Sequence, residues 1–244
     1  MQPLFSEITA LCRDEQFLHS VMKKYHYSPE EYPNLKRLAG EMVPCLETEA
    51  GWQDRDFEET FPGRDQSFLA VGITLGKGID ALQEKYLQGG FLTESYMIEV
   101  LSSELLLKSY QAYTEWVVTH RELHMARLYF LGSEIPEAKA ADERLVSRLR
   151  LENLPTLLQE LQMPVTCNEA YCMIPKKSVV FYAELTKDPF TKCAGICLGC
   201  GRRDCPNRME ERENFPLRFV DMTDRPLSYG YARIFSKSSD KNGR

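Results

Sequence analysis

The sequence predicts an α+β fold, in which N-terminal helices and a long central helix pack on a mainly antiparallel sheet. Two observations lead to this prediction. Apolar residues at helical spacing dominate the chain as far as Pro164, and runs of β-branched and aromatic residues dominate after it. In addition, an apolar run at 67–76 has the length of a strand.

The first part of the chain, residues 1–62, is predicted to be a segment of short helices. Phe17 and Val21 share one face at helical spacing. The letters "SPEE" are typical of a helix start, with Ser28 as the N-cap. The letters "FPGRDQ" at 61–66 indicate a turn, so we place the end of this segment there.

The run "SFLAVGITLG" at 67–76 follows this turn and predicts a strand that ends in glycine. The next segment has the periodicity of an amphipathic helix, and Gly89 and Gly90 are expected to stop it. Its apolar residues at helical spacing are Ile79, Leu82 and Tyr86.

A longer helix is predicted from about Thr93 to His124. Its apolar stripe is wide, which indicates that most of its sides are buried. The run "ARLYFLG" at 126–132 then predicts another strand. Residues 136–162 again have a helical pattern, with a break expected before Pro155 because the residue preceding a proline avoids helical geometry.

The sequence changes in character at Pro164. Two β-type runs flank the turn-like letters "IPKK", and further short strands are predicted at 216–222 and 231–236. The last residues, 237–244, form a polar tail that we expect to fray. We therefore assign residues 63–236 to one α+β domain.

Composition limits the classes of partner. The formal net charge of −6 argues against a nucleic acid partner, because phosphate binding requires a basic surface. The N-terminal residues lack the pattern of a secretory signal, and no apolar run is long enough for a membrane span. We therefore expect a cytoplasmic protein whose thiols stay reduced, with no membrane partner.

Four of the eight cysteines lie within residues 193–205, in the segment "CAGICLGCGRRDC". Four thiolates so close in sequence suit a 4Fe–4S cluster, whose negative charge the neighbouring arginines would offset. Structural zinc is the alternative, although zinc sites usually have two separated CxxC-like pairs. A third interpretation treats some of these thiols as buried apolar side chains. The predicted metal ligands are Cys193, Cys197, Cys200 and Cys205.

The other four cysteines are isolated in the sequence. Cys167 and Cys172 lie shortly before the cysteine-rich segment, where either could serve as a substitute ligand. We expect both to be core residues instead, because free cysteine is usually buried. The remaining two are Cys12 and Cys45.

Two stretches carry a resemblance to a known family. The stretch "FLAVGITLGKGIDALQEKYLQGGFLTESYMIEVLSSELL" resembles the strand, "TLG" and helices of the reactivation (activation) domain of cobalamin-dependent methionine synthase. The stretch "VTCNEAYCMIPKKSVVFYAEL" is similar to that family's strand signature. Stand-alone members of the family often end in a cysteine-rich segment, as this chain does. The resemblance covers about residues 65–210.

The resemblance implies a reactivation-domain-like fold and a role in corrinoid chemistry. Members of this family bind S-adenosylmethionine and dock on a corrinoid protein whose cobalt has become oxidised to cob(II). The expected function is therefore reductive reactivation or methylation of a corrinoid protein or corrinoid methyltransferase, with cobalamin carried by that partner. A 4Fe–4S cluster in this chain could deliver the electron, and an electron donor for the cluster would be a further partner.

The resemblance also suggests cofactor-binding residues. Arg127, in "RLYFLGS", is the expected counterpart of the family's arginine, and it would bind the methionine carboxylate. Glu169 lies in the strand signature and would face the sulfonium or the ammonium group. Tyr171 would place its aromatic face against the positive sulfur.

Each of these residues also has a structural interpretation. Arg127 could pair with a carboxylate of the fold, Glu169 could be a hydrogen-bonded carboxylate at a strand end, and Tyr171 could be a core residue. Two alternative functions follow for the whole chain: a small iron–sulfur electron-transfer protein, or an interaction module stapled by zinc.

Overall fold

The fold was obtained as a computed structural model, which describes residues 6–55, 67–132, 147–188 and 190–191. These residues form helices and a four-stranded sheet, which confirms the predicted α+β class. The sheet has the order β1-β2-β6-β3, and all of its pairings are antiparallel. Its strands are β1 (Glu49–Arg55), β2 (Ser67–Thr74), β3 (His124–Phe130) and β6 (Ser178–Thr186).

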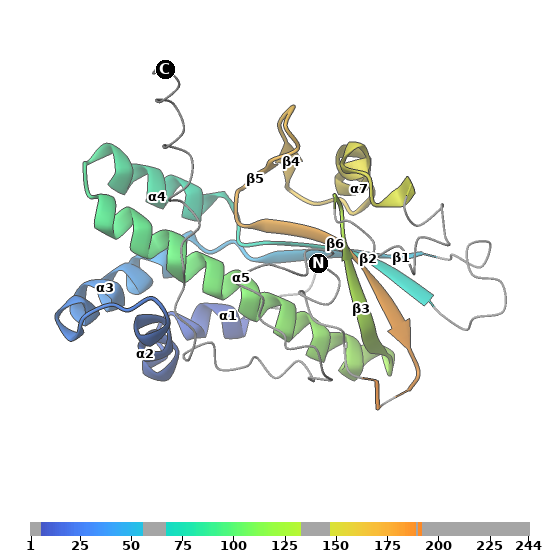
Figure 1. The fold of residues 1–244 in the computed structure, drawn as a ribbon, viewed down its shortest axis with the longest axis horizontal. Helices are drawn as coiled ribbons and strands as arrows, with labels where there is room; N and C mark the ends of the chain where they lie inside the picture. The colour runs from blue at the N-terminus through green and yellow to red at the C-terminus, as the bar shows by residue number, and fades with distance from the viewer. Residues whose placement is uncertain (1–5, 56–66, 133–146, 189, 192–244) are drawn as a thin grey trace, which may run out of the picture.

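The long α5 packs on one face of the sheet, and the other N-terminal helices pack on α5 (Figure 1). They share a first hydrophobic cluster with alternate residues of the strands, among them Leu69 and Phe181. Tyr113 and Val117 of α5 are fully buried there. These helices are α1 (Ser6–Leu11), α2 (Glu15–Lys24), α3 (Tyr32–Met42), α4 (Lys77–Gln88) and α5 (Leu92–Arg121), with 3₁₀ turns at η1 (Pro29–Glu31) and η2 (Val43–Cys45).

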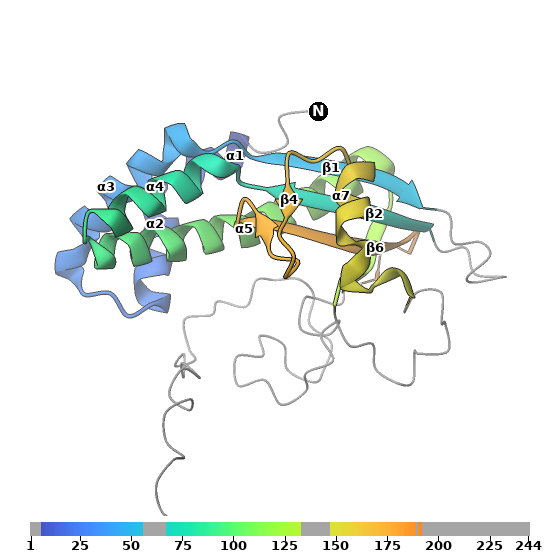
Figure 2. The ribbon, with the colours of Figure 1, turned by 90° about the horizontal axis from the view of Figure 1, so that it is seen from above.

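The other face of the sheet carries a smaller layer. Figure 2 shows α7 and β4 in front of the sheet. A second hydrophobic cluster joins this layer to the remaining strand residues, including Phe68 and Tyr182. Strands covered on both faces have side chains buried on both sides, which explains the unbroken apolar runs of β2 and β6. The elements of this layer are η4 (Leu151–Asn153), α7 (Leu154–Glu160), β4 (Thr166–Cys167) and β5 (Met173–Ile174).

Most of the predicted elements agree with the structure. The strand at 67–76, the helix that follows it and the long central helix correspond to β2, α4 and α5. The break before Pro155 is also present, because η4 gives way to α7 at Leu154. The C-terminal strands predicted at 216–222 and 231–236 lie outside the described residues. Among those residues, no helix is long and apolar enough to cross a membrane.

Strand β1 is a correction to the sequence analysis, which predicted only helices in residues 1–62. Its letters "EAGWQDR" contain glycine and three charged residues, so its own β-propensity is weak. Tertiary contacts stabilise it instead. The ring centroid of Trp52 lies 4.5 Å from that of Trp116 on α5, and the Asp54 carboxylate accepts two hydrogen bonds from Arg121. This strand makes the N-terminal segment part of the sheet.

Two helical glycines provide a test of how tightly the helical layer packs. A Cβ at Gly78 in α4 would lie 2.4 Å from the carbonyl oxygen of Cys45, whereas a Cβ at Gly40 in α3 would meet no atom within 4 Å. We therefore expect Gly78→Ala to lower the free energy of unfolding by about 1–3 kcal/mol. Gly40→Ala should raise it by about 0.5–1 kcal/mol, because alanine favours the helix. Urea denaturation of both variants measures the difference, and equal effects would contradict the packing described here.

Candidate functional site

The four predicted metal ligands, Cys193, Cys197, Cys200 and Cys205, lie outside the described residues, so the metal site stays a prediction. The last described residue, Thr191, comes two positions before Cys193 in the sequence.

A hydrogen-bonded turn positions Thr191. Its hydroxyl donates to Oδ2 of Asp188 at 2.8 Å, and the backbone N–H of Phe190 donates to Oδ1 at 3.0 Å. These two hydrogen bonds lower the pKa of Asp188, and the charge of nearby His124 adds to the shift. The turn follows β6 closely, and the last residue of β6, Thr186, pairs with His124, the first residue of β3.

Arg127 lies at this same end of the sheet. It belongs to β3, where Glu184 of β6 is its cross-strand partner. Its guanidinium carbon lies 5.9 Å from the ring centroid of Tyr129, whose hydroxyl donates to Oε2 of Glu184 at 2.8 Å. Burial raises the pKa of Tyr129 to about 12, and the Glu184 carboxylate adds to this effect. We call these three residues the Arg127 cluster.

The hydrogen bonds of the Arg127 guanidinium are incomplete. Its Nε atom is buried and has no hydrogen-bond partner. In the described part of the chain no ion pair joins Arg127 to a carboxylate, although its side chain also hydrogen-bonds Tyr129. A buried donor without a partner is costly, so a carboxylate that reached Nε by uncovering it would gain a favourable contact.

The strand signature suggested that Glu169 lies in a strand, but the structure places it elsewhere. It lies in the turn between β4 and β5, where its side chain is exposed. Asn168 organises this turn, because its Oδ1 accepts from the backbone N–H groups of Ala170 and Cys172 at 3.0 and 2.9 Å. Glu169 lies in a turn and not in a strand because the Asn168 side chain accepts these backbone hydrogen bonds, which favours a turn over continued strand pairing.

Tyr171 lies in the same turn with a positive φ of 58°, and its backbone N–H donates to the carbonyl of Asn168 at 2.9 Å. Its ring is partly buried and packs against the second hydrophobic cluster. This placement agrees with the interpretation of Tyr171 as a packing residue.

The structure does not bring the three predicted residues together by direct polar contact. Among the described residues, no hydrogen bond or ion pair joins Arg127 to Glu169 or Tyr171. Arg127 lies beside Glu184, whereas the turn leads into β6 at Ser178. Six strand residues separate these points, which is about 20 Å along the strand.

The two stretches that carry the resemblance do contact one another. The hydroxyl groups of Thr74 and Ser178 lie 2.7 Å apart in the core, and the backbone N–H of Leu75 donates to the carbonyl of Lys177 at 2.9 Å. The N–H of Gly76 donates to the Thr74 hydroxyl at 3.1 Å. The hydrogen bonds between the "TLG" and "IPKKS" residues therefore hold β2 and β6 in register, close to the start of α4.

Lys177 is a buried polar residue that the sequence analysis missed. Its ammonium group donates to the Glu99 carboxylate and to the Ser103 hydroxyl, both on α5. The Gln83 amide donates to the other oxygen of Glu99 at 3.0 Å. In the sequence, only its position in the "IPKKS" residues could have indicated this role, because its partners are more than 70 positions away.

The isolated cysteines differ in exposure. Cys12 is buried and Cys167 partly buried, whereas Cys172 is exposed at the β4–β5 turn. The prediction that Cys167 and Cys172 are core residues is therefore wrong for Cys172. Burial raises the pKa of Cys45, and it raises that of Cys12 to about 11. Cys12 therefore stays a thiol at neutral pH and is a poor metal ligand.

The burial of Cys12 predicts a pH dependence of stability. An unfolded cysteine ionises near pH 8.5, whereas the folded Cys12 keeps its proton up to about pH 11. The stabilising contribution is complete below pH 8.5 and is lost as the pH rises towards 11. Between pH 7 and 10.5, the free energy of unfolding should fall by about 2.5 kcal/mol more in the wild type than in Cys12→Ala. Urea denaturation at both pH values measures this, and parallel losses would contradict it.

The described structure thus places one polar cluster, around Arg127, on the β3–β6 pair. Comparison with protein-family models finds no match, and a search of the curated proteins finds no significant match.

Proposed function

We propose that this chain supports the reductive reactivation or methylation of a corrinoid protein, like the methionine synthase reactivation domain that its sequence resembles. In this proposal, Cys193, Cys197, Cys200 and Cys205 bind a 4Fe–4S cluster, and Arg127 binds S-adenosylmethionine. One observation supports it: Arg127 and Glu184 pair across β3 and β6, and the turn that follows β6 ends at Thr191, two positions before Cys193 in the sequence. A methyl donor and a source of electrons would then be close to one another.

Arg127 is suited to hold a methionine carboxylate. A guanidinium can donate two parallel hydrogen bonds to a carboxylate, which fixes orientation as well as affinity. The unpartnered Nε atom of Arg127 supplies one donor of such a pair. Packing over the ring of Tyr129, which is itself tied to Glu184, restricts where the guanidinium can point.

The cysteine-rich segment supplies the expected electron-transfer part. Iron–sulfur clusters exchange single electrons at potentials that hydrogen bonds and local charge adjust. Cys193 follows Glu184 by nine residues in the sequence. The arginines at 202, 203 and 208 would offset the negative charge of four thiolates.

Isothermal titration calorimetry with S-adenosylmethionine tests the proposal on the folded, metal-loaded protein. We expect saturable binding to one site per chain. If the folded protein carries its iron but gives no heat of binding, the methyl-donor role is wrong. That result would favour a small iron–sulfur electron-transfer protein instead.

A further inference from the structure

Strand β1 is an edge of the sheet, and its outer backbone groups face no other strand within the described ranges. Natural edge strands are usually protected by a bulge, a proline or a lysine. The other edge, β3, has a register shift between Met125 and Arg127. By contrast, β1 pairs with β2 in one unbroken register from Glu49 to Arg55, and it contains no proline or lysine. This edge is therefore open to pairing.

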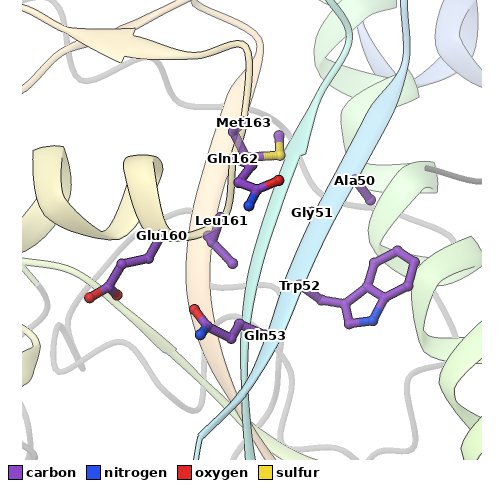
Figure 3. A pocket seen from close by; sticks show the side chains of 8 residues that line it. All are labelled: Ala50, Gly51, Trp52, Gln53, Glu160, Leu161, Gln162 and Met163. Atoms are coloured by element: carbon purple, nitrogen blue, oxygen red, sulfur yellow. The ribbon is translucent and has the colours of Figure 1, made fainter.

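A groove of about 380 Å³ runs beside this edge (Figure 3). One wall is β1 and the other is the end of α7 with the residues that follow it, from Glu160 to Met163. At the middle of β1, Gly51 approaches this second wall so closely that a Cβ would lie 2.6 Å from the carbonyl oxygen of Leu161. Leu161 therefore covers one face of β1 at Gly51, whereas no described strand pairs with the outer edge of β1.

The edge is held firmly in place. Trp52 packs on Trp116 and on Tyr113 of α5, and Asp54 is bound by two hydrogen bonds from Arg121. In Figure 3 the Trp52 side chain points away from Leu161 and Gln162, towards the helices. A strand that is already ordered loses little conformational entropy when it pairs.

We propose that β1 pairs with β1 of a second copy of this chain, antiparallel, about a two-fold axis at Trp52. The strand sequence is self-complementary in this register, because Glu49 of each copy lies opposite Arg55 of the other. Gln53 lies opposite Gly51, whose one face is covered by Leu161 and Met163. Opposite charges directly across an antiparallel pair are stabilising, and like charges are destabilising.

The geometry of the strand supports this register. Side chains alternate between the faces of a sheet, so Glu49, Gly51, Gln53 and Arg55 share one face. Arg55 already binds Glu160 on that face, and Glu49 has no ion-pair partner among the residues that the structure describes. Glu49 of a second copy would therefore extend an existing ion pair into a network of three charges. On the helical face, the two Trp52 rings would meet near the axis.

We expect the dimer to be weak and dependent on concentration. Pairing of two short strands buries a small area, at the low end of specific interfaces. Each chain also has a net charge of −6, which opposes association. The chain has two tryptophans, and both lie at or against this edge, so fluorescence should change as the dimer forms.

Sedimentation equilibrium of the full metal-loaded chain, with tryptophan fluorescence beside it, tests the proposal. We expect a monomer–dimer equilibrium that Glu49→Arg weakens at least tenfold, because it places two arginines opposite each other twice in the dimer. The double variant Glu49→Arg/Arg55→Glu should restore much of the association. Glu7→Arg, which makes the same charge change at an exposed site on α1, is the control and should have a much smaller effect.

Three results would overturn the proposal. A monomer at all concentrations would mean that this edge pairs with another segment or partner, or with none. A dimer that Glu49→Arg leaves intact would place the interface elsewhere. Failure of the double variant to associate, while far-UV circular dichroism shows it folded, would exclude this register.

Discussion

Cys197→Ser should remove the visible absorbance that thiolate-bound iron gives to an anaerobically reconstituted preparation. Cys197 is the second ligand of the predicted set and opens its CxxC pair, so a serine there leaves only three thiolates. Because the wild-type cluster is expected to give an EPR signal after reduction with dithionite, the variant should lose that signal as well. This is the largest effect that we expect of any single substitution.

The matched control for this variant is Cys172→Ser. Cys172 is exposed, lies in the β4–β5 turn and is outside the four-cysteine pattern. The Cys172→Ser variant should keep the iron and the EPR signal at wild-type levels. If Cys197→Ser also retains the iron, the assignment of the ligands is wrong. A colourless wild type with one bound zinc would instead favour the zinc-stapled module.

Arg127→Ala should weaken the binding of S-adenosylmethionine by about 10- to 100-fold, as expected when a charge-assisted bidentate contact is lost. Arg127→Lys should give an intermediate loss, because lysine keeps the charge but cannot donate two parallel hydrogen bonds. Titration calorimetry on the metal-loaded variants measures both.

The control here is Arg13→Ala, which removes an exposed arginine near the end of α1. It should bind the ligand as the wild type does. Thermal unfolding of each variant separates a loss of binding from a loss of structure. Wild-type affinity in a folded Arg127→Ala variant would show that this guanidinium does not hold the ligand.

The parts of the fold that were predictable have strong local patterns. The apolar run of β2 and the paired glycines after α4 each determine an element with little help from distant residues. Strand β1 was not predictable, because Trp52 and Asp54 are stabilised by Trp116 and Arg121, more than 60 positions away in the sequence. Tertiary contacts of this kind override weak local preferences.

In the candidate site, too, some features were predictable from local sequence and others depend on tertiary contacts. Sequence alone could single out the cysteine spacing and Arg127, but the partners of Arg127 depend on the pairing of β3 with β6, including its bulge. A shift of one residue would place Glu184 on the other face of the sheet. The placement of Glu169 in a turn likewise depends on the hydrogen bonds that Asn168 accepts.

The most direct test of the central claim, that the cysteine-rich segment binds an iron–sulfur cluster, is the iron and acid-labile sulfide content of the wild-type protein prepared without oxygen. The account predicts about four of each per chain, as in a 4Fe–4S cluster. A folded preparation that contains neither iron nor sulfide would contradict it.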